Sequence, residues 1–156
     1  MCPNFGYSIT GLDPDRTSIA SGRDVRCSPK QAREVCHAIK GMIIEDAKSY
    51  LDSVILQKQA VPFKRYNKKQ AHRKGLDRFK WDAGRYPVKA SQAVLNILQN
   101  AENNAEFKGL DLDRVRVIHA AIARGRKVKK YIPRAFGRSS PYFKTLTHIE
   151  IVLEEE

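Results

Sequence analysis

The sequence has little of what most catalytic or metal-binding proteins display. Its 156 residues include three cysteines, at positions 2, 27 and 36, without CxxC spacing, and four histidines. An odd cysteine count without such spacing argues against a disulfide framework and a structural zinc site. The sequence contains no Walker A, GxGxxG or HExxH pattern. We therefore expect no metal, no cofactor and no catalytic residues, in a reduced, intracellular protein.

Long apolar runs are also missing. The longest nearly apolar stretch, residues 117–123, is interrupted by His119 and is too short to span a bilayer. Asp13 and Asp15 stand near the start, where a secretory signal has a basic and then an apolar region, so we expect neither a membrane segment nor a signal peptide. Hydrophobic residues still make up 42% of the chain, which predicts a folded core in one domain covering residues 1–156.

Acidic residues are scarce relative to basic ones. The chain has 29 Lys and Arg against 17 Asp and Glu, for a formal net charge of +12. The excess lies in two segments: residues 60–86 hold nine basic and two acidic residues, and residues 124–144 hold eight basic residues and no acid. This distribution predicts a near-neutral body with a basic insert at about 60–86 and a basic extension at about 124–144, both directed at a polyanionic partner.

Hydrophobic periodicity predicts three helices. Ser28 before Pro29, with Gln31 three positions after Ser28, indicates an N-cap with a capping box, and the apolar stripe that follows ends near Gly41. A second helix is predicted at about 44–57. A third begins near Pro87, carries a long apolar face and ends at Gly109.

Strand patterns complete the predicted fold. Alternating or β-branched residues predict strands at 19–26, 115–119 and 145–153 in one small sheet. If the last two strands pair antiparallel, residues 124–144 form a hairpin that reaches roughly 33 Å from the body. The predicted fold class is therefore α+β, with three helices packed on a small antiparallel sheet and a long protruding basic β-hairpin.

Several isolated polar groups have simple structural interpretations. Cys36 lies on an apolar helix stripe and is expected to be buried, while the neighbouring His37 points off that stripe. The predicted strand pairing allows His119 and His148 to face each other, without an evident nucleophile beside them. The remaining acidic candidates are interpreted as solvated groups: Glu102 and Glu106 on the third helix, and Glu154, Glu155 and Glu156 in a C-terminal tail.

Both basic segments also contain aromatic residues, among them Tyr66, Trp81, Tyr131 and Phe136. Cations interleaved with aromatic rings suit phosphate neutralisation together with stacking on unpaired bases. The candidate RNA-binding residues are the basic side chains Lys64, Arg65, Lys68, Lys69, Arg73, Lys74, Arg85, Arg124, Arg126, Lys127, Lys129, Lys130, Arg134, Arg138 and Lys144. One alternative is that both segments are merely solvated, and another is a chromatin-like DNA-binding protein. A third is an RNA-processing enzyme, which would need positioned acids, a metal site or a nucleophile, and the sequence presents none of these.

Six segments and a basic insert resemble a known family. They are residues 28–33 (SPKQAR), 85–91 (RYPVKAS), 100–106 (NAENNAE), 133–138 (PRAFGR), 144–145 (KT) and 147–153 (THIEIVL), with residues 62–69 (PFKRYNKK) in the insert. Together they are similar to the family of large-subunit ribosomal protein twenty-two, in its archaeal and eukaryotic branch and most closely to its archaeal members. The likeness covers most of the chain but leaves the first 16 residues without a family signal.

The resemblance implies a structural, non-enzymatic role. In this family a globular body sits on large-subunit rRNA near the exit of the polypeptide tunnel, and a hairpin lines the tunnel wall, which supports subunit assembly and translation. The implied partners are large-subunit rRNA, neighbouring ribosomal proteins and the nascent polypeptide, with no membrane, no homo-oligomer and a cytoplasmic location in the large subunit. The implied tunnel-lining tip comprises Pro133, Arg134, Ala135, Phe136, Gly137 and Arg138. We also expect the two basic segments to become ordered only against RNA.

Overall fold

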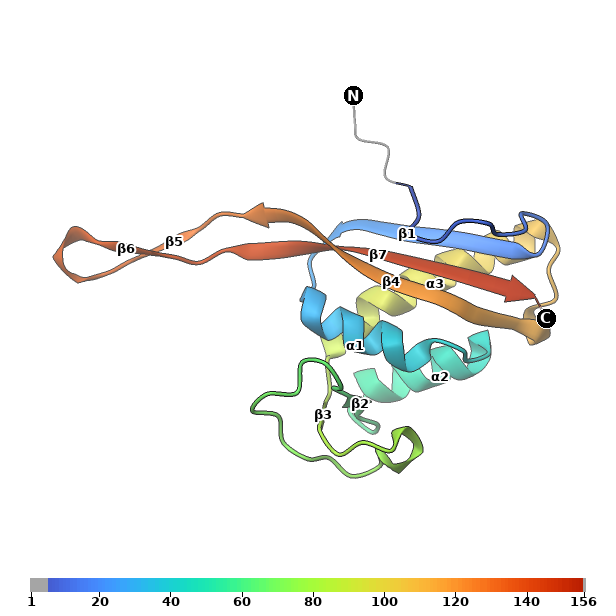
Figure 1. The fold of residues 1–156 in the computed structure, drawn as a ribbon, viewed down its shortest axis with the longest axis horizontal. Helices are drawn as coiled ribbons and strands as arrows, with labels where there is room; N and C mark the ends of the chain where they lie inside the picture. The colour runs from blue at the N-terminus through green and yellow to red at the C-terminus, as the bar shows by residue number, and fades with distance from the viewer. Residues whose placement is uncertain (1–5, 156) are drawn as a thin grey trace.

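A three-stranded antiparallel sheet organises the body. The computed structural model describes residues 6–155, and its central sheet has the order β1–β7–β4 (Figure 1). The strands are β1 (Thr17–Val25), β4 (Val115–Val128) and β7 (Lys144–Glu155). The C-terminal strand therefore lies in the middle and pairs along both edges. The predicted sheet and α+β fold class are confirmed.

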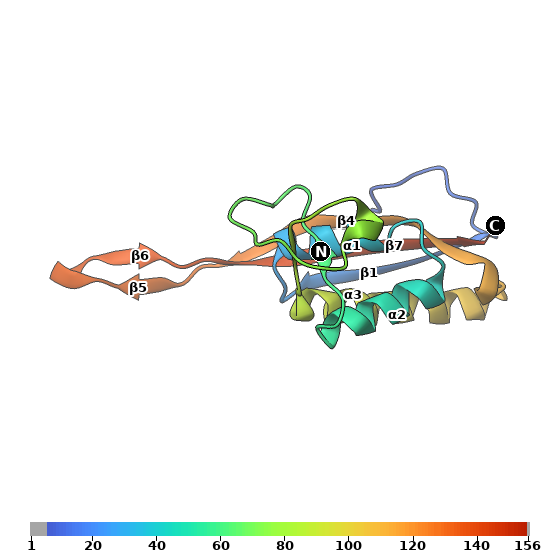
Figure 2. The same cartoon turned by 90° about the horizontal axis from the view of Figure 1, so that it is seen from below.

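Three helices pack against this sheet (Figure 2). They are α1 (Pro29–Ile39), α2 (Ile44–Ile55) and α3 (Val88–Lys108), close to the predicted ranges. Helix α1 packs on β4, α3 packs on β1 and β7, and α2 packs on α3. In the chain segment described, no helix is both long and apolar enough to cross a membrane.

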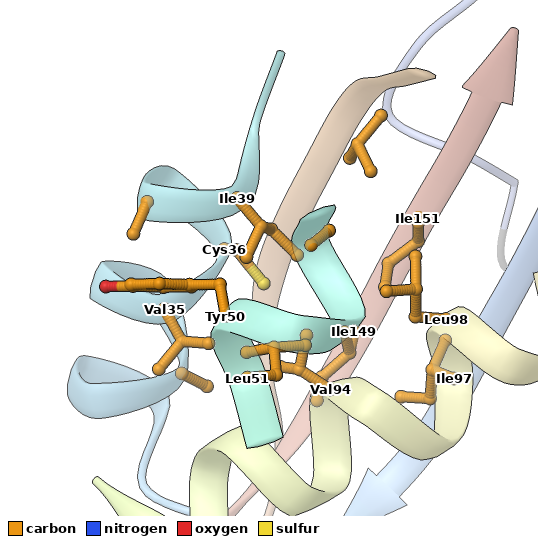
Figure 3. Packing of buried hydrophobic residues seen from close by; sticks show 14 of the residues in the cluster. Val35, Cys36, Ile39, Tyr50, Leu51, Val94, Ile97, Leu98, Ile149 and Ile151 are labelled. Carbon is orange, nitrogen blue, oxygen red and sulfur yellow. The ribbon is translucent and has the colours of Figure 1, made fainter. Parts of the chain in front are cut away.

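The interface between helices and sheet is the hydrophobic core (Figure 3). Fully buried side chains from every layer meet there, including Ile39 from α1, Leu51 from α2, Leu98 from α3, and Ile149 and Ile151 from β7. Burying each such side chain contributes about 1.5–3 kcal/mol, so this layer supplies the main stabilisation of the body.

The helix ends follow backbone geometry more than side-chain capping. Gly109 ends α3 as predicted, with a φ of 75° that a residue with a Cβ rarely adopts. The predicted capping box at α1 is wrong, because within the described structure the Ser28 side chain makes no capping hydrogen bond. The Ser28 carbonyl accepts the Ala32 N–H at 2.9 Å, and Pro29 has no N–H that needs a partner.

Residues 60–86 form a loop-rich insert between α2 and α3. Its ends pair as the short strands β2 (Val61–Pro62) and β3 (Gly84–Arg85), with a 3-10 turn, η1 (Asp77–Phe79), between them. Phe63 and Leu76 are buried and fix the insert to the body. A second short turn, η2 (Leu112–Arg114), leads into β4.

Beyond the sheet, β4 and β7 continue as a hairpin that projects far from the body (Figure 1). Their pairing extends to Val128 opposite Lys144, and the hairpin continues as β5 (Tyr131–Pro133) and β6 (Ser139–Pro141) around the turn η3 (Ala135–Gly137). The predicted projecting hairpin is confirmed.

Strand register corrects the predicted pairing of two histidines. A register shift between Val117 and His119 places His119 opposite Val152, and His148 lies opposite Ala123. The two rings therefore do not face each other. Alternation assigns the two faces of a strand but not its register, and even without the shift His119 would lie opposite Ile151, so the pattern alone gave the wrong partner.

Two predictions about acidic residues also need correction. Glu102 is not simply solvated, because it forms an ion pair with Lys48 that links α3 to α2, whereas Glu106 is exposed as predicted. Glu154 and Glu155 do not belong to a tail, since β7 continues through both and Glu155 pairs with Val115. Glu156 lies outside the described residues.

The segment before β1 is bonded to the sheet through Ser8. The backbone N–H and the hydroxyl of Ser8 both donate to Oε2 of Glu150, at 3.0 and 2.8 Å, and its Oγ lies 2.9 Å from Nε2 of His119. These bonds link the N-terminal segment to β4 and β7, a role for which the sequence offers no signal.

Candidate nucleic-acid interface

All the predicted RNA-binding cations on the hairpin are exposed. They come from both arms and from the tip, and no acidic residue lies between residues 124 and 144. They are Arg124, Arg126, Lys127, Lys129, Lys130, Arg134, Arg138 and Lys144. Figure 1 shows that the hairpin stands away from the body, so the body does not cover these charges. Such a surface is suited to a polyanion that surrounds the hairpin.

The hairpin tip is closed by backbone bonds. The Arg134 N–H donates to the Arg138 carbonyl at 2.8 Å, and Arg134 Nε donates to Ser140 Oγ at 3.2 Å. Phe136 and Gly137 both adopt positive φ values, 56° and 67°. The left-handed turn leaves the Phe136 ring 98% exposed at the far end of the molecule. A non-glycine residue in a left-handed position is uncommon, and here it holds the Phe136 side chain open to the surroundings.

A cluster of polar groups holds the hairpin where it leaves the body. Arg126 donates from Nε and Nη2 to Oδ2 of Asp24, at 3.2 and 3.1 Å, and the Asp24 N–H donates to Nδ1 of His148 at 3.1 Å. We call Asp24, Arg126 and His148 the hairpin clamp. Gly125 is required beside it, because a Cβ there would lie 2.6 Å from Asp24 Oδ1. Arg126 therefore has a structural role in addition to its predicted role in RNA binding.

The clamp also changes the acidity of Asp24. Desolvation raises the pKa of this carboxyl group, but the hydrogen bonds and charge of Arg126, with the charge of His148, more than compensate. The net pKa lies below its ordinary value, so Asp24 keeps its charge, and its ion pair, into acidic solution.

The predicted insert cations are exposed as well, and the body positions them. They are Lys64, Arg65, Lys68, Lys69, Arg73, Lys74 and Arg85. The carboxylate of Glu34, buried on α1, accepts three backbone N–H groups: Oε2 accepts that of Lys64 at 3.1 Å, and Oε1 accepts those of Arg65 and Tyr66 at 3.1 and 3.0 Å. Charge-assisted bonds of this kind are about twice as strong as neutral ones, so Glu34 fixes the start of the basic loop.

Aromatic rings in the insert are surrounded by cations. The Tyr66 ring lies 5.6 Å from Lys30 Nζ and 5.8 Å from the Arg65 guanidinium, and Arg73 lies 5.6 Å from the Tyr86 ring. Trp81 Nε1 donates to the Phe63 carbonyl at 2.9 Å, which ties the far side of the insert back to its start. The aromatic residues of this segment thus help to order the insert, and the side chains of Tyr66, Trp81 and Tyr86 are half-buried.

The structure adds three cations that the sequence analysis missed. A hollow of about 990 Å³ lies where the hairpin joins the body, and Arg26, Lys30 and Lys89 line it together with four of the hairpin cations. They lie in the near-neutral body, Arg26 and Lys30 four residues apart and Lys89 much later in the chain, so the two charge runs did not include them. Two sequence signals lay near this site: the Ser-Pro start of a helix beside Lys30, and the family-like segments 28–33 and 85–91, which contain Lys30 and Lys89.

The described residues show no arrangement of His, Cys, Asp and Glu, three or more together, that could hold a metal ion. Cys36 is buried, as predicted, and desolvation raises the pKa of its thiol to about 12, which keeps it protonated and unreactive at neutral pH. His37 is exposed on the other side of α1, so the adjacent pair is not a catalytic dyad.

The fold and its exposed cations define a class: basic, nucleic-acid-binding α+β proteins with a projecting hairpin. Residues 20–154 match the family described as ribosomal protein L22p/L17e, and the chain belongs to this family. It is 50% identical over 154 residues to the large ribosomal subunit protein uL22 of Methanopyrus kandleri, covering 97% of this chain and 96% of that protein. It is 46% identical over 155 residues to the protein of the same name from Methanocaldococcus jannaschii, covering 99% and 97%.

A third archaeal relative, the large ribosomal subunit protein uL22 of Archaeoglobus fulgidus, is 47% identical over 148 residues and covers 95% of this chain and 94% of that protein. These similarities confirm both the resemblance and its archaeal character. The family is one of non-enzymatic structural proteins, in agreement with the expectation of a structural, non-enzymatic role.

Proposed function

We propose that this chain is a structural protein of the large ribosomal subunit that binds large-subunit rRNA through its insert and its hairpin. Fifteen basic side chains on these two elements are exposed, and this observation carries the proposal. A surface with this density of positive charge is stable next to a polyanion, because the basic side chains displace the condensed counterions of the polyanion. The relatives named as large ribosomal subunit proteins support the assignment of that polyanion as rRNA.

The division of the molecule suggests how the parts are used. The chain acts as one domain, residues 1–156, with the insert at about 60–86 and the hairpin extension at about 124–144. The body rests near the exit of the polypeptide tunnel beside neighbouring ribosomal proteins, and the hairpin runs inward along the tunnel wall. Residues 133–138 at the tip then lie beside the nascent polypeptide. The length of the hairpin and its exposed tip support this placement.

Neutralising hairpin cations tests the rRNA contacts. Lys129, Arg134 and Arg138 are suitable because they are exposed and outside the hairpin clamp. Each phosphate contact contributes roughly 0.7–0.9 to the slope of log affinity against log salt. We expect the triple change to Gln to weaken binding to a large-subunit rRNA transcript and to lower that slope by about 2.

Filter binding over a series of KCl concentrations measures this slope. The control is Lys40→Gln, which lies at the C-terminal end of α1, whereas the start of α1 lies beside the base of the hairpin. An unchanged slope in the triple variant would contradict the assignment of these contacts. Equal affinity of the wild-type chain for duplex DNA and for the rRNA at physiological salt would instead favour a chromatin-like role.

A further inference from the structure

The hollow at the base of the hairpin combines charges from two parts of the molecule. Its body wall carries Arg26, Lys30 and Lys89, and its hairpin wall carries Arg124, Lys127, Lys130 and Lys144. Among the described residues that line it, none is acidic. Like charges converging on one concave surface are mutually repulsive, and an anion held between the walls relieves that repulsion.

Two helix starts add to the positive potential. Helix α1 begins in the body wall at Pro29. In the described structure the Ser28 hydroxyl accepts no hydrogen bond from the backbone N–H groups of the first turn. Helix α3 begins at Val88, next to Lys89. The N-terminal end of a helix carries about half a positive charge, so both helices favour an anion at the place where the seven cations converge.

The hollow also has an aromatic component. Phe143 lines it, is 45% exposed and packs edge-on against Tyr131, with ring centroids 5.8 Å apart and planes at 90°. The contact with Tyr131 steadies the Phe143 ring while part of it stays accessible. A steadied aromatic ring beside cations matches the way in which proteins bind unpaired nucleotides, with phosphates on the cations and a base on the ring.

We propose that this hollow binds an unpaired segment of RNA, with its phosphates on the cations of both walls and one base against Phe143. The proposal rests on the rRNA-binding function and specifies where and in what form RNA is held. A paired helix keeps its bases stacked inside and cannot place one on Phe143. Because the bound RNA segment contacts the hairpin and the body together, it fixes the direction of the hairpin relative to the RNA.

The charge contribution is tested with the double variant Arg26→Gln and Lys89→Gln in the full chain. Its matched control is Lys40→Gln with Arg114→Gln, which removes the same two residue types from the end of the body away from the hairpin. Lys40 follows the last residue of α1, about 16 Å from its start. The probe is a large-subunit rRNA transcript. We expect the salt slope to fall by about 1.4 in the hollow variant and to remain unchanged in the control.

The stacking contribution is tested with Phe143→Leu against Phe107→Leu. Phe107 is 93% exposed near the C-terminal end of α3, so it controls for loss of an exposed ring. Stacking of a base on an aromatic ring is worth roughly tenfold in affinity. We expect about tenfold weaker binding for Phe143→Leu and no change for Phe107→Leu. Circular dichroism and the thermal midpoint of each variant establish that it is folded.

The outcomes separate the two proposals. If wild type binds the rRNA transcript but the hollow variant has the same slope as its control, the hollow is not an RNA site and the general function stands. If Phe143→Leu binds as tightly as Phe107→Leu, no base stacks there and the unpaired-segment proposal is overturned. If wild type does not bind the transcript at all, the rRNA-binding function itself fails.

Discussion

The two basic extensions carry similar charge but are held in different ways. The insert is bound to the body by the buried side chains of Phe63 and Leu76 and by the carboxylate of Glu34. The hairpin buries none of its cations or aromatic rings in the described structure and depends on strand pairing and on the hairpin clamp at its base. The comparison shows that two segments of similar charge density can differ in how firmly the body holds them.

The largest expected effect comes from removing an apolar anchor of the insert. Leu76 is 1% exposed, so Leu76→Ala leaves a cavity and is expected to lower the free energy of unfolding by about 3 kcal/mol. The comparable hairpin residue Ile132 is 39% exposed, and Ile132→Ala is expected to change stability by less than about 0.5 kcal/mol. Urea unfolding of both variants measures the difference. Equal losses would show that the insert is no better anchored than the hairpin.

The next effect comes from Glu34. Glu34→Ala removes the acceptor of three backbone N–H groups in a partly buried site, and we expect a loss of about 2 kcal/mol. Amide hydrogen exchange at Lys64, Arg65 and Tyr66 is expected to accelerate, while exchange in the hairpin stays as in wild type. Glu45→Ala, on the exposed first turn of α2, is the control. Unchanged exchange at the three amides would contradict the role assigned to Glu34.

A smaller effect is expected at the base of the hairpin. In Gly125→Ala the new Cβ meets Asp24 Oδ1 at 2.6 Å and His148 Nε2 at 3.0 Å, so the clamp has to shift. We expect a destabilisation of about 1 kcal/mol, the lower end of the range for overpacking, because the site is near the surface. Adding Asp24→Gly, which removes the clashing carboxylate and suits the φ of 50° at this position, is expected to recover part of the loss. No recovery would place the strain elsewhere.

The smallest effect concerns pH. The pKa of Asp24 is lower in the folded chain than its ordinary value of 3.8, so its contribution to stability is complete above that value and is lost as the pH falls through the folded pKa. The stability difference between wild type and Asp24→Asn is therefore expected to be constant near neutral pH and to shrink below about pH 3.8. Unfolding curves at several pH values measure it. A difference that grows on acidification contradicts the depressed pKa.

Much of the fold could be predicted because it follows from local patterns. The apolar stripes predicted the three helices, and Gly109 predicted the end of α3. The β-branched final segment predicted the strand that lies in the centre of the sheet. The hairpin was predictable because an acid-free run lies between two strands that have to pair. The register shifts of β4 were not predictable, since one unpaired residue leaves no periodic signal. The expected His119–His148 pair failed because alternation does not determine which residues of two strands lie opposite each other.

The candidate interface was predictable where charges cluster in sequence and unpredictable where folding gathers them. Arg26, Lys30 and Lys89 lie in the near-neutral body and meet the hairpin cations only because α1 and α3 both begin beside its base. Glu34 was missed because its partners are backbone N–H groups at least 30 residues away in the sequence, and no side-chain pattern predicts such bonds. Its place next to Val35 on the buried face of α1 was the one available signal.

This chain belongs to a family of large-subunit ribosomal proteins, and we propose that its exposed basic extensions hold it in the subunit. Sedimentation of a cell lysate through a high-salt sucrose gradient, with detection of the chain in each fraction, tests it most directly. We expect the chain to remain with the large subunit after the salt wash, because the proposed contacts of the insert, the hairpin and the hollow would hold it on the RNA together. Release into free or DNA-bearing fractions would contradict the claim.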